Sequence, residues 1–282
     1  MTALVNLANM DLTPLIGTQD PSGSASITQV QVDKMPSSGL SWPGNLTAQV
    51  PGDVGADFGL ILRNRPAHIG SGRPLEDLYP VIEIKLGDRW QLSLDDGIKY
   101  TAARFGPLSI GPVVEFRQSF SDRLPKGAHK MPDAVEAGGF VVYKTPIGDF
   151  ESRLRNAVNS YKGWSGDLSF DTGGHITPTT GIGLEIRASW ADNNFSNQYF
   201  GLKHHSSDLF SLPRFLPNDY TTFGAELTVG HKIDAVTTLF AQTSLDRIYG
   251  EEWRSPVLKS RNIFIFSLGV TWHFGQRTPD SL

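Results

Sequence analysis

The segment from Phe264 to Phe274 alternates between apolar and small or polar residues, and this period of two strongly constrains the fold. A strand places alternate side chains on opposite faces, whereas a helix needs apolar spacings of three and four. The segment is therefore predicted to be a strand. One face carries Phe264, Phe266, Leu268, Val270, Trp272 and Phe274, and the other carries Ser267, Gly269, Thr271 and His273.

The same alternation recurs from about residue 53 onward, with Gly, Pro, Asn and Asp between the repeats. Short connections mostly alternate with long ones, which is typical of outer-membrane barrels with short turns at one rim and long loops at the other. We therefore predict an all-β fold, a transmembrane antiparallel up-and-down β-barrel of about twelve strands over residues 51–274. The predicted strands are 53–64, 78–86, 88–94, 98–105, 107–120, 135–144, 147–158, 163–172, 179–190, 219–230, 234–246 and 261–274.

The two ends of the chain are predicted to lie outside the barrel wall. Residues 1–50 are rich in Ser, Thr, Gly and Pro, and we expect an N-terminal extension in the periplasm or the lumen, with one short strand at 26–32. Residues 275–282 are expected to form a C-terminal tail. Met1–Ile16 does not resemble a signal peptide, because polar residues interrupt its apolar stretch.

Composition excludes some classes of function. A net charge of -4 gives no electrostatic reason to expect nucleic-acid binding, which favours basic surfaces. The chain has no cysteine, which excludes disulfides, thiolate metal sites and cysteine nucleophiles. The mean hydropathy of -0.21 does not separate a soluble β protein from a barrel, because barrel strands present only alternate side chains to lipid.

The polar face of the strands favours a membrane barrel over a soluble sandwich. Four strands carry an acid and a base two positions apart, as in Glu185-Ile186-Arg187, so both charges lie on one face. An arginine facing lipid near the bilayer midplane would cost about 2–4 kcal/mol, so these charges are expected to line the lumen. The alternative is an ordinary solvated sheet face. The candidate lumen charges are Asp57, Arg63, Glu83, Lys85, Glu115, Arg117, Glu151, Arg153, Arg155, Glu185, Arg187 and Glu226.

Aromatic residues fall near both ends of the predicted strands. Interfacial girdles of aromatic side chains mark the two membrane–water boundaries of outer-membrane barrels. The candidate girdle comprises Trp90, Phe105, Trp272 and Phe274 at the short-turn end, and Phe120, Trp190 and Tyr220 at the long-loop end.

Several motifs resemble the MipA/OmpV family of outer-membrane proteins over about residues 53–274. The most specific are Trp190-Ala-Asp-Asn-Asn-Phe-Ser-Asn-Gln-Tyr-Phe-Gly-Leu202, Asp219-Tyr220, Ser255-Pro256-Val257-Leu258 and the closing strand Phe266–Phe274. The segments Gly87–Trp90 and Phe105–Pro112 are similar but less specific. The chain departs from common barrels in carrying residues 275–282 after the terminal aromatic Phe274, which the barrel-assembly machinery would have to tolerate.

The resemblance implies a closed barrel in the outer membrane of a Gram-negative bacterium, without enzymatic activity. For the family's named member it implies a scaffold that joins a murein-cleaving lytic transglycosylase to a murein-synthesising penicillin-binding protein. The charged lumen leaves a passive channel for small solutes as an alternative. The expected surroundings are outer-membrane lipid and lipopolysaccharide.

A third hypothesis, a barrel lipase, depends only on His204, His205 and Ser206, for which no base-orienting partner is evident. A basic loop could contact lipopolysaccharide phosphates through Arg123, Lys126, His129 and Lys130, although solvated loop charge is the more ordinary interpretation. Asp192, Asn193, Asn194 and Asp208 do not have the spacing of a known calcium loop. The sequence predicts no cofactor and no metal site.

Overall fold

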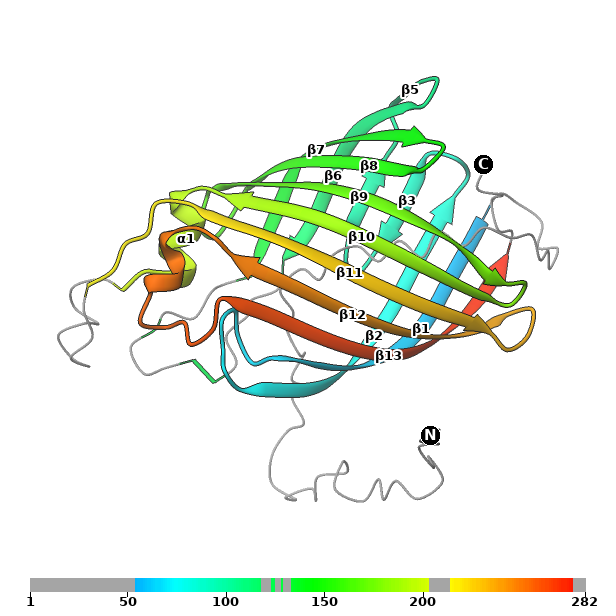
Figure 1. The fold of residues 1–282 in the computed structure, drawn as a ribbon. Coiled ribbons are helices and arrows are strands. Elements are labelled where there is room, and N and C mark those ends of the chain that lie inside the picture. Colours follow the sequence, from blue (N-terminus) through cyan, green and yellow to red (C-terminus); the bar gives the residue numbers. More distant parts are fainter. Residues whose placement is uncertain (1–53, 118–122, 125–127, 129–132, 203–213, 276–282) are drawn as a thin grey trace, which may run out of the picture.

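The computed structural model describes residues 54–117, 123–124, 128, 133–202 and 214–275. Most of these residues lie in one antiparallel sheet that closes on itself (Figure 1). The predicted N-terminal extension, the tail 276–282, and Phe120 therefore lie outside the described residues.

The strands are β1 (Val54–Pro66), β2 (Pro74–Leu86), β3 (Trp90–Ser93), β4 (Gly97–Tyr100), β5 (Ala103–Phe105), β6 (Leu108–Arg117), β7 (Ala134–Thr145), β8 (Gly148–Ala157), β9 (Trp164–Thr177), β10 (Thr180–Ala191), β11 (Tyr220–Lys232), β12 (Thr237–Ile248) and β13 (Asn262–Gly275).

The barrel wall has twelve strands, because β4 and β5 act as one interrupted strand. Both pair with β6, where the sequence analysis predicted a single strand at 98–105. The interruption lies opposite Gly111, where an added Cβ would lie 1.8 Å from the backbone oxygen of Tyr100. Only glycine allows the two backbones to approach this closely.

The wall closes where β1 meets β13, in a register that runs from Gly55 opposite Gly275 to Asn64 opposite Phe266. Closure removes the exposed edges that an open sheet would carry. The outward face of β13 carries the apolar residues from Phe264 to Phe274, and Ser267, Thr271 and His273 are buried on the inward face. The fold is thus the antiparallel barrel that the alternation predicts.

The β3–β4 hairpin is much shorter than its neighbours. β3 pairs with β2 only from Glu83 to Leu86, and the Leu94 N–H donates to the Ile82 oxygen just beyond. Within the described residues, the stretch 74–81 of β2 therefore pairs with β1 alone. Pro74 and Pro80 lie in this stretch, as expected for a strand edge, where a missing N–H is tolerated.

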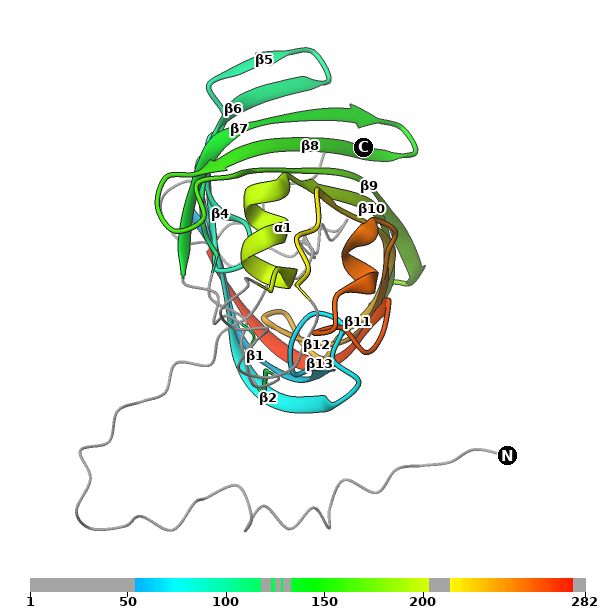
Figure 2. The same cartoon turned by 90° about the vertical axis from the view of Figure 1, so that its left-hand side faces the viewer.

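Within the described residues, two helices stand at the long-loop end of the barrel: α1 (Asn193–Phe200) and the 3₁₀ helix η3 (Glu251–Arg254). Figure 2 looks along the barrel and shows α1 inside the ring of strands. Neither helix was predicted, since the sequence analysis assigned both segments to loops. No helix in the described part of the chain is long and apolar enough to cross a membrane.

A small apolar core lies at the long-loop end, around α1. It draws residues from several connections, including Ile69, Tyr161, Phe195, Phe200 and Val257. Phe200 stacks on Tyr220 with ring centroids 5.4 Å apart, and Phe195 packs edge-on against Tyr161 at 5.3 Å. We call this group of side chains the apolar plug.

Candidate functional site: the charged lumen and the apolar plug

The N-terminus of α1 is fixed to the wall by Asp192. Its carboxylate accepts hydrogen bonds from the backbone N–H groups of Asn194 at 3.0 Å and Phe195 at 3.1 Å, which caps the helix. The same carboxylate accepts from the Trp164 N–H at 2.9 Å, at the start of β9. One side chain therefore fixes the helix relative to the strand and sets the depth of Phe195 and Phe200.

Below the plug, the lumen is filled by ion pairs between strands. Glu136, which is 0% exposed, accepts hydrogen bonds from Arg117 and Tyr161, from Arg155 Nε at 3.1 Å and from Ser165 Oγ at 2.9 Å. A buried carboxylate is stable only when its oxygens are compensated in this way. The Arg117 guanidinium also lies 5.2 Å from the Phe195 ring, which joins the charged layer to the plug.

A second group of ion pairs spans the lumen beneath Glu136. Arg153 on β8 donates to Asp96 at 2.7 Å in the β3–β4 turn, and also approaches Glu115 at 3.4 Å. Lys99 on β4 pairs with Glu151 on β8 at 2.8 Å. β4 and β8 are not adjacent in the wall, so these contacts cross the interior.

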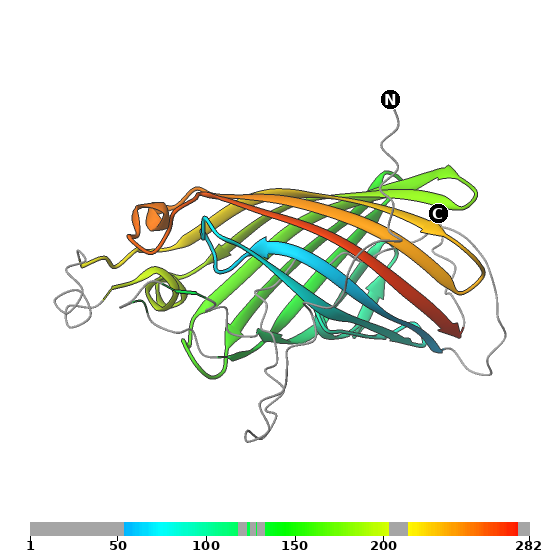
Figure 3. The ribbon, with the colours of Figure 1, turned by 90° about the horizontal axis from the view of Figure 1, so that it is seen from below.

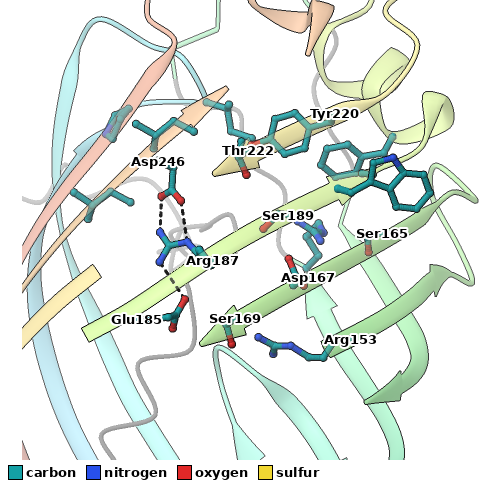
Figure 4. A pocket seen from close by; sticks show the side chains of 18 of the residues that line it. Arg153, Ser165, Asp167, Ser169, Glu185, Arg187, Ser189, Tyr220, Thr222 and Asp246 are labelled. Carbon is teal, nitrogen blue, oxygen red and sulfur yellow. Dashed lines mark hydrogen bonds and ion pairs between the residues drawn. The ribbon is translucent and has the colours of Figure 1, made fainter. Parts of the chain in front are cut away.

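The third group lies on the opposite wall, where Arg187 pairs with both oxygens of Asp246 (Figure 4). Glu185 lies 3.3 Å from Arg187 on the same strand, and Glu226 lies 3.7 Å away on β11. A smaller group near β1 joins Arg63 and Arg65 to Asp77, with Nε–Oδ distances of 2.8 Å each. The Arg63 guanidinium also lies 4.0 Å from the Tyr79 ring.

The residues named as lumen charges lie at inward positions of their strands. Arg63, Glu115, Arg153, Arg155, Glu185, Arg187 and Glu226 are buried, whereas Asp57, Glu83, Lys85, Arg117 and Glu151 are half-buried. Three of the four same-strand acid–base pairs are in contact, namely Glu83–Lys85 at 3.3 Å, Glu151–Arg153 at 3.2 Å and Glu185–Arg187 at 3.3 Å. Arg117 instead pairs with Glu136 on β7, and Asp57 contacts His273 at 2.9 Å.

Several partners that complete these networks were not predicted from the sequence: Arg65, Asp77, Asp96, Lys99, Glu136, Asp167 and Asp246. None of them has an opposite charge two positions away in the sequence, so the spacing that identified the other lumen charges does not identify these. For all but Asp96, which lies in the β3–β4 turn, an inward strand position was the available signal.

The aromatic girdle differs from expectation at one position. Trp90, Phe105, Trp190, Trp272 and Phe274 are exposed on the outer face of the wall. The prediction for Tyr220 is wrong: its side chain is only 9% exposed, lies at an inward position of β11, and packs on Phe195 and Phe200. Aromatic rings at a strand end serve either the interface or the plug, and the sequence alone did not distinguish them.

Between the plug and the ion pairs lies a cavity of about 120 Å³. Its lining includes Arg65, Arg117, Arg153, Glu185 and Arg187, several of which Figure 4 shows around the space. This space is large enough for several water molecules, since one needs at least about 10–15 Å³. Within the described residues, no group of three or more His, Asp or Glu side chains could hold a metal ion.

One acidic group above the membrane is also buried without compensation. Glu252 in η3 is 0% exposed, and neither of its carboxylate oxygens has a hydrogen-bond partner. Burial, with Asp219 and Glu251 nearby, raises the pKa of Glu252 to about 7. His204, His205 and Ser206, on which the lipase hypothesis depends, lie outside the described residues, as do Lys126, His129 and Lys130 of the basic loop.

Comparison with known proteins identifies a family. The family model described as "MltA-interacting protein MipA" matches residues 58–274. The "Putative outer membrane protein YiaT" of Escherichia coli strain K12 is 25% identical over 126 residues, 44% of this chain. The aligned part spans about half the length of that relative.

Two solved structures of outer-membrane proteins are similar to this chain at low sequence identity. The NanC porin has 11% identity and a TM-score of 0.40, over 76% of this chain and 98% of the porin. The COG4313 outer membrane channel from Pseudomonas putida F1 has 10% identity and a TM-score of 0.39, over 82% of this chain and 99% of the channel.

Proposed function

Because the chain belongs to the MipA family of MltA-interacting proteins, we propose that this outer-membrane barrel is a non-enzymatic scaffold for murein enzymes. In this role it holds a murein-cleaving lytic transglycosylase beside a murein-synthesising penicillin-binding protein. The observation that carries the proposal is the filled interior: the apolar plug covers one end of the lumen and ion pairs span the barrel beneath it. We expect a barrel wall held together by these contacts to be rigid, as a platform for two enzymes requires.

The short-turn rim offers a contact surface for such partners. Ile147 is 72% exposed at the β7–β8 turn and Ile233 is 57% exposed at the β11–β12 turn. This rim faces the periplasm in outer-membrane barrels, where murein lies. Contiguous exposed apolar surface marks interaction sites, and on this proposal the two isoleucines belong to such a surface. We propose that the transglycosylase binds this rim.

Binding of the purified barrel to a lytic transglycosylase of the MltA type tests the proposal. We expect wild-type binding, and at least a tenfold weaker affinity after the double change Ile147→Ser and Ile233→Ser. The matched control is Val158→Ser with Tyr249→Ser, which removes exposed apolar side chains at the opposite rim and should leave the affinity unchanged. Absence of binding by the wild-type barrel would overturn the scaffold role.

The cavity beneath the plug favours one second candidate, a passive channel for small solutes. Its charged lining resembles a selectivity region, in which side chains of both signs discriminate among solutes. Conduction would require the plug to move aside. Planar-bilayer recordings test this candidate. Phe200→Ala should raise the conductance above that of the wild-type protein if the plug gates a path. Absence of conductance in both the variant and the wild-type protein would exclude a channel.

A further inference from the structure

The end of β12, the start of β13 and the loop between them lie at the long-loop rim (Figure 3). Their side chains form a basic and aromatic surface. It consists of Arg247, Tyr249, Trp253, Arg254 and Arg261, and we call it the arginine rim. Arg261 lies 3.4 Å and Arg254 lies 5.6 Å from the centroid of the Trp253 ring, measured from Cζ. Arg247 lies 6.0 Å from the Tyr249 ring and opposite Asn262 in the strand register.

The arginine rim differs from the lumen in lacking acidic partners. In the lumen, arginines such as Arg63, Arg153 and Arg187 lie within 4 Å of carboxylates. Within the described residues, Arg247, Arg254 and Arg261 contact aromatic rings and no carboxylate. The segment 249–261 has one exposed acid, Glu251, because the Glu252 side chain is buried. The surface therefore presents a net positive charge to an external anion.

The height of the arginine rim relative to the membrane suggests which anion it meets. Leu245 and Phe264 face each other in the register and are 51% and 54% exposed on the lipid-facing side of the wall. Arg247 lies two residues beyond Leu245 on the same face, toward the long-loop end. Tyr249 and Trp253 are the residue types that favour the boundary between lipid and water. The guanidinium groups thus stand at the level of the lipid headgroups.

We propose that the arginine rim binds the phosphate groups of lipopolysaccharide in the outer leaflet. A guanidinium donates two parallel hydrogen bonds to a phosphate, and stacking on a ring orients its plane while leaving its edge free. Arg261 and Arg254 both contact the Trp253 ring, which brings two guanidinium groups to one side chain. This site depends on the outer-membrane location and is independent of the scaffold role.

Lipid binding by the full chain in detergent micelles tests the site. The probes are lipid A with its phosphates, enzymatically dephosphorylated lipid A, and inorganic phosphate. We expect wild-type protein to bind phosphorylated lipid A at least tenfold more tightly than dephosphorylated lipid A. Arg247→Gln with Arg261→Gln should abolish this preference. Inorganic phosphate should compete only weakly, because it lacks the acyl chains that lie beside Leu245 and Phe264.

The control is the double variant Arg89→Gln and Arg104→Gln, which removes two exposed arginines at the opposite rim. It should retain the wild-type preference for phosphorylated lipid A. Equal affinity of the wild-type protein for the two lipids would overturn the proposal, as would an equal loss in the control. Competition by inorganic phosphate at the concentration of lipid A would also overturn it, since the ligand would then be a free anion.

Discussion

Arg155 on β8 donates from Nε to Glu136 on β7 over 3.1 Å, and both side chains are 0% exposed. Glu136 also accepts from Arg117, so this one carboxylate contacts two guanidinium groups, one buried and one half-buried. Removing one member of such a network leaves the others charged in a medium that solvates them poorly.

We therefore expect Glu136→Gln to destabilise the barrel by about 3–5 kcal/mol, the usual range for breaking a buried ion pair. The measurement is the free energy of unfolding by urea in lipid vesicles. The control is Asp149→Asn, which removes the exposed partner of Lys144 at 3.6 Å and should cost less than about 1 kcal/mol. Equal stability of the two variants would show that the Glu136 network does not brace the wall.

The position of the plug depends on the cap of α1. Asp192→Ala removes three hydrogen bonds to backbone N–H groups, from Asn194, Phe195 and Trp164, and should cost about 1–2 kcal/mol locally. Hydrogen exchange of residues 193–200 should become faster, while exchange of the strands stays unchanged. Asn193→Ala, an exposed change in the same turn, is the control. Unchanged exchange in Asp192→Ala would mean that packing alone holds the helix.

The sequence predicted the faces of the strands well, because alternation depends only on the local chain. Leu184 and Ile186 face outward while Glu185 and Arg187 are buried, as a lumen lined with charge requires. The ion pairs were less predictable, because register decides which residues meet across strands. Glu136 has Ala134 and Gly138 two positions away, so no residue on its own strand indicates that Arg117 and Arg155 are its partners.

The two helices were missed for a different physical reason. The segment Asn193–Phe200 contains three Asn and aromatic residues, which have modest helix propensity. Its helix is stabilised by the Asp192 cap and by burial of Phe195 and Phe200 in the plug, which tertiary structure supplies. The split between β4 and β5 likewise depends on the close approach at Gly111, which a single strand pattern does not reveal.

The stretch of β2 that pairs on one side only should be the least protected part of the wall. Leu75–Tyr79 pairs with β1 alone in the described structure, whereas Leu60–Asn64 of β1 pairs on both sides. We expect about half of the amides in Leu75–Tyr79 to exchange at least tenfold faster than those in Leu60–Asn64, because alternate N–H groups point to the open side. Hydrogen exchange in detergent micelles measures the difference. Equal protection would mean that another segment covers this edge.

The loop at the long-loop rim is expected to respond to pH through Glu252. Ser255, which is linked to Glu252 through a backbone hydrogen bond of 2.8 Å, donates its hydroxyl to the Phe200 oxygen at 2.7 Å. The conformation of η3 is therefore coupled to the position of the plug. Burial raises the pKa of Glu252 from its usual value of 4.5 to about 7. A raised carboxyl pKa means that the folded loop holds its proton more tightly than the unfolded loop does.

The resulting stabilisation is complete below pH 4.5 and is lost as the pH rises toward 7, where Glu252 ionises without a partner. We expect hydrogen exchange of residues 251–258, corrected for the intrinsic pH dependence of exchange, to accelerate between pH 5 and about 8. Glu252→Gln keeps the shape without the charge, so its corrected rates should stay at the slow value throughout. Glu251→Gln, a change at the exposed neighbour, should retain the acceleration. The same acceleration in Glu252→Gln as in the wild-type protein would assign it to another group.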